Sequence, residues 1–292
     1  MLSAHHQVMT KQIVVGYDSS PPSVEAVNWA ASEASARHCA LRIVSCYGIP
    51  LTAVSGAAWV AGDVLTSIED ETSESARSIK AVLTELHPAL EITVEVCLGP
   101  PRASLIQSLE PSDVLVVGTS NHEGAAGFWL GSTSRWATRH SPCAVVVVRG
   151  AASRGRPDRI VVGIDGSAPS RAALVWAADE ADLHRVDLVV VHSWDDVSLG
   201  VDIRAEQARD LARIDAATVL DCAVEVARER CAATVKDVLV EGEVATSLVD
   251  SVRDGDLLVL GAGGRGSIVA GFLGSTVNRV VGQSVVPVVV VR

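Results

Sequence analysis

Two segments of the chain end an apolar run in glycine and then repeat one glycine–serine–threonine spacing. The first is Asp113-Val-Leu-Val-Val-Gly118, followed thirteen residues later by Gly131-Ser132-Thr133. The second is Asp256-Leu-Leu-Val-Leu-Gly261, followed at the same spacing by Gly274-Ser275-Thr276. Glycine lets backbone N–H groups approach an anion because it has no Cβ, and the first turn of a helix offers unbonded N–H groups. The doubled spacing therefore predicts two phosphate cradles, although paired tight turns with Ser-capped helices would give the same pattern.

An acidic residue ends the first apolar run of each half. Ile13-Val-Val-Gly-Tyr-Asp18 in the first half corresponds to Ile160-Val-Val-Gly-Ile-Asp165 in the second. In doubly wound sheets a ligand binds outside the carboxyl ends of the strands, where the strand order reverses. The acid and the cradle of each half would then face one another across one crevice, with the carboxylate accepting hydrogen bonds from sugar hydroxyls or an exocyclic amine. Asp is also an ordinary helix N-cap, but the cradle in the same half favours ligand contact.

The similarity between the halves covers nearly the whole chain. Trp29-Ala30 recurs as Trp176-Ala177, with the offset of 147 that also separates the two acids. A repeat of this length is the size of a domain, whereas solenoid repeats span about 20 to 50 residues. We therefore expect two tandem copies of one fold. The expected division is a first domain over 1–149, a linker over 150–157 and a second domain over 158–292.

Each half alternates apolar strands with helical patterns. Strands without polar alternation indicate a parallel sheet covered on both faces, so the expected fold class is α/β with two doubly wound, Rossmann-like domains. Residues 48–63, which contain Gly56 and Gly62, are expected to form a loop, either an insertion or a mobile lid. The expected elements are 12–18, 22–38, 41–47, 68–86, 91–98, 101–109, 113–118, 132–140 and 143–149, then 159–165, 169–184, 187–194, 203–231, 235–240, 243–253, 256–261, 275–282 and 286–292.

Composition excludes several classes of partner. The net charge of −11 argues against nucleic acid, because phosphate backbones need a basic surface, and no polybasic membrane patch is present. No apolar run reaches the roughly 18 residues of a membrane span, and the first ten residues do not resemble a signal peptide. The six cysteines show no CxxC spacing. We expect a globular protein with reduced thiols in the cytoplasm.

Better-known catalytic and nucleotide motifs do not fit. Residues 261–266 match G-x-G-x-x-G, but no acid follows at the required distance, and neither a Walker A sequence nor a G-x-S-x-G elbow occurs. His122 and Glu123 could be pictured as an acid–base pair, but the second copy has Arg265 and Gly266 there, which favours solvated loop residues. His192 is more simply a partly buried histidine than a catalytic one.

With these residues in place, the chain resembles the universal stress protein family. The resemblance rests on the spacing Gly-x2-Gly-x9-Gly-Ser/Thr and on a strand-one Gly-x-Asp-Gly-Ser that precedes a Trp-Ala helix. It covers both halves, as in tandem members. The first copy departs from the pattern at Ser19, which replaces glycine, and at Asn121, which replaces the second cradle glycine. The complete second copy consists of Gly163, Asp165, Gly166, Ser167, Gly261, Gly264, Gly274 and Ser275.

The resemblance implies five-stranded parallel sheets of order 3-2-1-4-5 and an adenine nucleotide, ATP with or without Mg²⁺, in each competent domain. Adenine is expected near Cys46 and Ser193. The final strands, at 145–148 and 288–291, are implied to pair domains and to form a homodimer. The implied nucleotide-binding residues are Gly16, Asp18, Gly118, Thr119, Asn121, Gly131, Ser132 and Thr133 in the first half, and Gly163, Asp165, Gly261, Gly264, Arg265, Gly274, Ser275 and Thr276 in the second.

The leading hypothesis is an ATP-binding regulator of stress or dormancy that hydrolyses ATP slowly at most, with the second half binding more tightly. One alternative is an ATP-consuming enzyme of the adenine-nucleotide hydrolase-like superfamily. Its double-glycine pyrophosphate loop is absent from both Asp18-Ser-Ser and Asp165-Gly-Ser. Another alternative is a nucleotide-free dimerising scaffold in which the cradle has lost its function.

Overall fold

The chain forms two compact units that correspond to its two halves. The computed structural model describes residues 10–48, 58–107, 109–119, 131–149, 156–195, 203–264 and 273–292. Within these residues, one unit contains 10–119 with 131–149, and the other contains 156–292.

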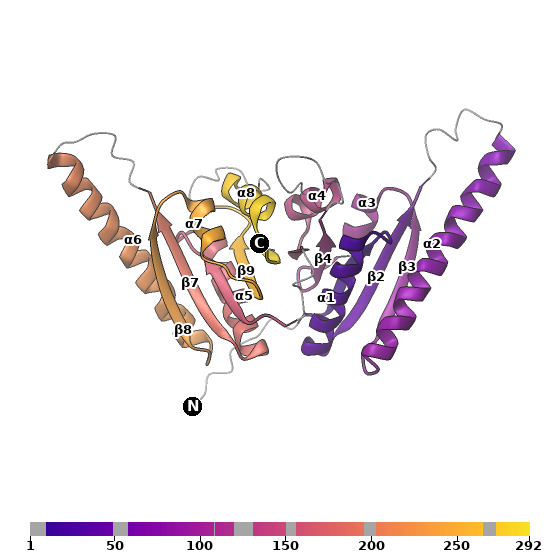
Figure 1. Ribbon diagram of the computed structural model, residues 1–292, viewed down its shortest axis with the longest axis horizontal. Coiled ribbons are helices and arrows are strands. Elements are labelled where there is room, and N and C mark those ends of the chain that lie inside the picture. The colour runs from indigo at the N-terminus through magenta and orange to yellow at the C-terminus, as the bar shows by residue number, and fades with distance from the viewer. Residues whose placement is uncertain are drawn as a thin grey trace. The chain divides into compact units, whose positions relative to one another are not determined.

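The first unit is a parallel sheet with helices on its faces (Figure 1). Its pairings run β3-β2-β1-β4-β5, so β1 lies between β2 and β4, and the order agrees with the expected one. Helix α1 packs on β1 and β4, and α2 packs on β2 and β3. The elements are β1 (Gln12–Tyr17), α1 (Pro21–Arg37), β2 (Ala40–Tyr47), α2 (Ala58–Leu86), β3 (Ile92–Leu98), α3 (Pro101–Ile106), β4 (Val114–Gly118), α4 (Ser132–His140) and β5 (Ala144–Val148).

The second unit repeats this arrangement. Its parallel pairings run β8-β7-β6-β9-β10, with β6 between β7 and β9. In Figure 1, α6 runs along β7 and β8 as α2 runs along β2 and β3. The elements are β6 (Arg159–Gly163), α5 (Ala168–His184), β7 (Asp187–Trp194), α6 (Ile203–Arg230), β8 (Val235–Glu241), α7 (Val244–Asp250), β9 (Asp256–Gly261), α8 (Ser275–Gln283) and β10 (Val288–Val291).

The cores explain the unbroken apolar runs. Ile13, Val14 and Val15 of β1 are all fully buried, although successive side chains point to opposite faces. Helices therefore cover both faces of the sheet, which confirms the expected α/β fold. Because the order reverses between β1 and β4, and again between β6 and β9, the carboxyl ends of these strand pairs flank the crevices in which ligands of such sheets bind.

One expectation about the first half is wrong. Residues 48–63 were expected to form a loop, but α2 begins at Ala58 and includes Gly62. A glycine inside a helix costs only about 1 kcal/mol relative to alanine, and a helix of 29 residues has many other positions that favour it. The remainder of that segment, 49–57, lies outside the described residues, so the lid and the insertion stay alternatives there.

Candidate functional site

The turn after β6 fixes the carboxylate of Asp165. The Ser167 backbone N–H donates to Asp165 Oδ1 over 2.9 Å, and Gly166 between them takes a left-handed conformation with φ of 78°. Ser167 is the N-cap of α5, because its Oγ accepts from the Ser170 N–H at 3.3 Å. One interpretation of the sequence made Asp165 the N-cap of this helix, and the structure shows that Ser167 is the cap instead. Asp165 lies two residues before this cap, just beyond the carboxyl end of β6.

The first unit builds the same turn with a different residue in the strained position. Asp18 Oδ1 accepts from the backbone N–H and the hydroxyl of Ser20, which caps α1. Ser19 holds the left-handed conformation with φ of 64°. Burial pushes the pKa of Asp18 up, but hydrogen bonds from Ser20 and Ser23 outweigh it and hold that pKa below its ordinary value. Asp18 is thus an ionised carboxylate at neutral pH.

The glycine that ends each fourth strand is required by the protein's own backbone. A Cβ on Gly261 would lie 2.5 Å from the Pro169 carbonyl oxygen and 2.8 Å from the Ser170 nitrogen. A Cβ on Gly118 would lie 2.4 Å from the Pro22 carbonyl oxygen. These glycines let the strand end pack against the first turn of the unit's first helix. Their predicted contact with phosphate stays a prediction, and packing alone explains the residue type.

The loop after β9 lies directly against the strand-one acid. A Cβ on Gly264 would be 2.6 Å from Asp165 Oδ2. Helix α8 begins nearby with Gly274 as its N-cap, and no side chain among the described residues caps its first turn. The Gly274 N–H is already used, because it donates to the Ala262 carbonyl at 3.1 Å. Available donors are therefore expected from Ser275 onward, where the N-terminal end of the helix dipole also favours an anion.

These features surround one cavity of 960 Å³ in the second unit. Its walls come from the carboxyl ends of β6, β7 and β9 and from α6, α7 and α8. The volume lies at the upper end of the range for small-molecule sites. The predicted residues that line it are Gly163, Asp165, Ser193, Gly261, Gly264, Gly274, Ser275 and Thr276.

Sequence reasoning missed several residues of this cavity or gave them no ligand role. His192, Trp194, Asp195 and Asp215 all line it. His192 is buried, and its Nδ1 lies 2.7 Å from the Ile164 carbonyl oxygen, so Nδ1 carries a proton that it donates to this carbonyl. Trp194 ends β7 one residue beyond Ser193, and this proximity to a predicted adenine contact was the available signal. Asp215 is on α6, and no local pattern marks its contribution.

The described lining of the cavity is acidic. It includes Asp165, Asp195 and Asp215, and neither lysine nor arginine occurs among the described lining residues. A polyanion held here would depend on backbone N–H groups and on a divalent cation. Carboxylate oxygens are ligands that Mg²⁺ prefers, and this ion commonly takes one or two of them together with substrate phosphates. The three carboxylates do not form one compact cluster, so a single one of them would complete the shell of an ion that the phosphates hold. Arg265, a predicted contact, lies outside the described residues, as does Asn121.

In the first unit, the positions that correspond to this site form hydrogen bonds to the backbone at the strand ends. Ser134 of α4 donates to the Gly118 carbonyl at 2.6 Å and ties the helix start to the strand end. Ser45 donates to the Tyr17 carbonyl at 2.8 Å, which is the contact that His192 makes in the second unit. Among the predicted residues, Gly16 packs against Leu105, Thr119 follows β4, Gly131 is the N-cap of α4, and Ser132 and Thr133 begin that helix.

Comparison with known proteins decides the family. The universal stress protein family matches residues 9–149 and 157–292, one copy for each half. The chain belongs to the universal stress protein family. It is a tandem-domain member, because the family matches each half separately. Universal stress protein Rv1996 of Mycobacterium tuberculosis is 30% identical to it over 96% of this chain and 94% of that protein.

Further relatives agree with this membership. Universal stress protein Rv2623 of M. tuberculosis is 28% identical over 96% of both chains. The crystal structure of a universal stress protein from Archaeoglobus fulgidus DSM 4304 aligns with a TM-score of 0.72 at 19% identity and covers 97% of this chain and 98% of that chain. That similarity supports the fold. Within the described part of the chain, none of the helices has the length and apolar character needed to cross a membrane.

Proposed function

We propose that this protein binds an adenine nucleotide, ATP, in the cavity of its second unit and acts as a stress-response regulator. The observation that carries the proposal is the contact between Asp165 and the loop at Gly264, beside the uncapped start of α8. This combination offers a hydrogen-bond acceptor for a ribose and N–H donors for phosphates in one space.

Each part of the cavity suits one part of the nucleotide. The carboxylate of Asp165 would accept from ribose hydroxyls. The backbone at Gly264 and the first turn of α8, including Ser275, would donate to phosphate oxygens. The end of β7, with Ser193 and the largely buried Trp194, would border the base. Ser193 Oγ donates to the Gly242 carbonyl at 2.9 Å, so its orientation is fixed.

The acidic lining favours the magnesium complex over the free nucleotide. Three carboxylates would repel an unscreened triphosphate, and they offer oxygen ligands to Mg²⁺. We expect removal of Mg²⁺ by EDTA to weaken ATP binding. Equal affinity with and without EDTA would show that backbone dipoles alone hold the phosphates.

We propose that the protein is not a dedicated enzyme. In the described part of the cavity, Nδ1 of His192 donates to the Ile164 carbonyl, so this nitrogen is not available as a general base. Turnover of ATP would then be slow at most. Rapid, stoichiometric release of AMP, pyrophosphate or phosphate in a single-turnover assay would instead favour an ATP-consuming enzyme.

Isothermal titration with MgATP tests the binding proposal, and the repeat supplies its control. Replacing Asp165→Ala removes a charged acceptor, so we expect affinity at the tight site to fall by about 10-fold or more. Asp18→Ala makes the same change in the first unit and is expected to leave that site intact. A folded wild-type protein that gives no heat with ATP, and releases no bound nucleotide on denaturation, would support the nucleotide-free scaffold.

Three broader features belong to the same proposal. A role in stress or dormancy, residence in the cytoplasm and homodimerisation through β5 and β10 are proposed together. Both strands are strongly apolar, with four consecutive valines in each, which suits strand addition at a sheet edge. Light scattering after size-exclusion chromatography of the wild-type protein would test the dimer. The mass of a single chain at micromolar concentration would contradict it.

A further inference from the structure

Two cysteines of the first unit stand side by side on neighbouring parallel strands. Cys46 of β2 is the register partner of Cys97 of β3, so both side chains leave the same face of the sheet near the carboxyl ends of the strands. Both are half-buried free thiols. The corresponding register pair in the second unit is Ser193 and Val240. The thiol pair is therefore a feature of the first unit that the repeat does not require.

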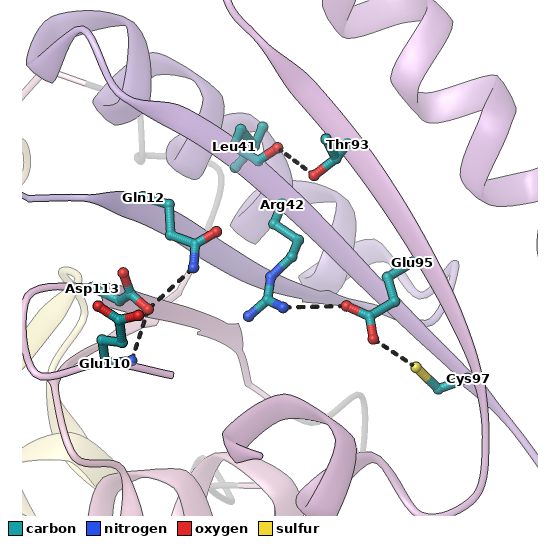
Figure 2. Close-up of polar contacts among 8 residues, drawn as sticks. All are labelled: Gln12, Leu41, Arg42, Thr93, Glu95, Cys97, Glu110 and Asp113. Atoms are coloured by element: carbon teal, nitrogen blue, oxygen red, sulfur yellow. Dashed lines mark hydrogen bonds and ion pairs between the residues drawn. The ribbon is translucent and has the colours of Figure 1, made fainter. Parts of the chain in front are cut away.

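Polar groups surround the pair. Cys97 Sγ lies 3.3 Å from Glu95 Oε1, and Arg42 Nη1 donates to the other oxygen of Glu95 over 3.2 Å (Figure 2). Ser104 of α3 acts in the direction of a lower pKa on both thiols. Burial raises the pKa of both thiols, and with the Glu95 carboxylate it raises that of Cys97 to about 11. The pair is thus fully protonated at neutral pH.

Arg42, which is ion-paired with Glu95, brings further hydrogen-bond donors to this cluster. Its Nε and Nη2 are buried and have no hydrogen-bond partner among the described residues. The matching position in the second unit is apolar, Val189, so the guanidinium is not demanded by the fold. A buried donor without a partner loses the hydrogen bonds that water would otherwise give it, which destabilises the folded protein. Additional negative charge on the neighbouring thiols would offset that cost.

The strand register places the two thiols where one ion could reach both. Neighbouring strands lie about 4.8 Å apart, a spacing that is also within the Cα separation of disulfides, and both cysteines are free thiols in the structure. Two metal–thiolate bonds of about 2.3 Å each span up to about 4.6 Å between sulfurs. In the described part of the chain, no third His, Cys, Asp or Glu completes a compact ligand set with both thiols. That excludes the closed four-ligand arrangement of structural zinc there.

We propose that Cys46 and Cys97 bind a soft monovalent cation of the Cu(I) class as a two-coordinate bis-thiolate. Soft thiolate ligands select Cu(I) over harder ions. The ion forms two metal–sulfur bonds, and two S–H bonds break. Both protons leave to solvent, that of Cys97 by way of Glu95, and no redox change occurs. The product carries one negative charge, which the guanidinium of Arg42 is placed to offset.

An anaerobic titration of the reduced full-length protein tests this assignment. Cu(I) is delivered against the chromophoric chelator bathocuproine disulfonate, which reports the free ion. We expect the wild type to withdraw one tight equivalent, and Cys46→Ser and Cys97→Ser each to lose it while keeping the wild-type circular dichroism. Cys222→Ser removes an exposed thiol of α6 and is the matched control. It should retain the tight equivalent.

Two further measurements make the result decisive. X-ray absorption of the loaded protein should show two sulfur neighbours and no shell of nitrogen or oxygen. Arg42→Leu should weaken binding without changing the stoichiometry. Equal Cu(I) binding by wild type and both single variants would overturn the proposal. So would tighter binding of Zn²⁺ than of Cu(I), or ready conversion of the pair to an intramolecular disulfide by diamide.

Discussion

At the scale of single residues, two glycines of the cradle have different structural roles, although the sequence pattern treats them alike. Gly261 avoids a collision with the backbone of Pro169, whereas Gly264 leaves room beside the Asp165 carboxylate. The sequence pattern assigned both glycines to the phosphate cradle. The packing role of Gly261 could not be predicted from the sequence, because Pro169 is 92 positions away. Only the packing of β9 against α5 brings Gly261 and Pro169 together.

Gly261→Ala should therefore destabilise the protein whether or not nucleotide is present. The new Cβ would meet the backbone of Pro169 and Ser170, which cannot rotate away, so we expect a loss of about 1–3 kcal/mol. Gly282→Ala in α8 is the matched control, because nothing lies within 4 Å of its Cβ and alanine favours helix. Urea unfolding of the apo protein measures both. Equal stability of Gly261→Ala and wild type would refute the packing role.

The turn at Asp18 predicts a dependence of stability on pH. Hydrogen bonds from Ser20 and Ser23 outweigh the effect of burial, so the folded-state pKa lies below the ordinary value of 3.8. The stabilisation is fully present above the unfolded-state pKa and is lost as pH falls through the folded-state pKa. Asp18→Asn should cost more stability at pH 6 than near pH 3. An identical cost at both pH values in chemical denaturation would contradict the depressed pKa.

At the scale of elements, the paired strands β1–β4 and β6–β9 are joined by different contacts in the two units. Arg159 makes two bonds of 2.8 Å to the carboxylate of buried Asp256. The matching contact in the first unit is a single hydrogen bond of 3.2 Å from Gln12 to Asp113, whose Oδ1 is buried without a partner among the described residues (Figure 2).

Arg159→Gln should destabilise the protein by about 3 kcal/mol, because it leaves the Asp256 carboxylate buried without its countercharge. The reciprocal change, Gln12→Arg, offers a charged donor to Asp113 and should be neutral or stabilising. Thermal or urea unfolding of both variants makes the comparison. A loss below about 0.5 kcal/mol for Arg159→Gln would place it among ordinary surface changes and would contradict this account.

Element boundaries followed the sequence closely where the apolar pattern was strong. The ranges expected for β7, β9 and α4 agree with the structure residue for residue. The sequence does not indicate the early start of α2, because the glycine and proline residues between 48 and 63 are typical of loops. The stability of a helix depends mostly on the packing of the whole element, so a glycine near one end does not prevent helix formation there.

At the scale of the whole molecule, two copies of one fold have diverged in chemistry. The second keeps a glycine at Gly166 and a cavity beside Asp165, whereas the first has Ser19 in the same left-handed position and a thiol pair near the end of β2. The sequence predicted the repeat and the departure at Ser19. The volume of the cavity and the contribution of α6 to it depend on tertiary packing, which no local pattern records.

The central claim is that the second unit binds ATP more tightly than the first. Its most direct measurement is a crystal structure of the protein with MgATP at less than one equivalent per chain. We predict nucleotide density in the second unit, bordered by Asp165, the loop at Gly264 and the start of α8. Equal occupancy of both units, or density in the first unit alone, would contradict the account.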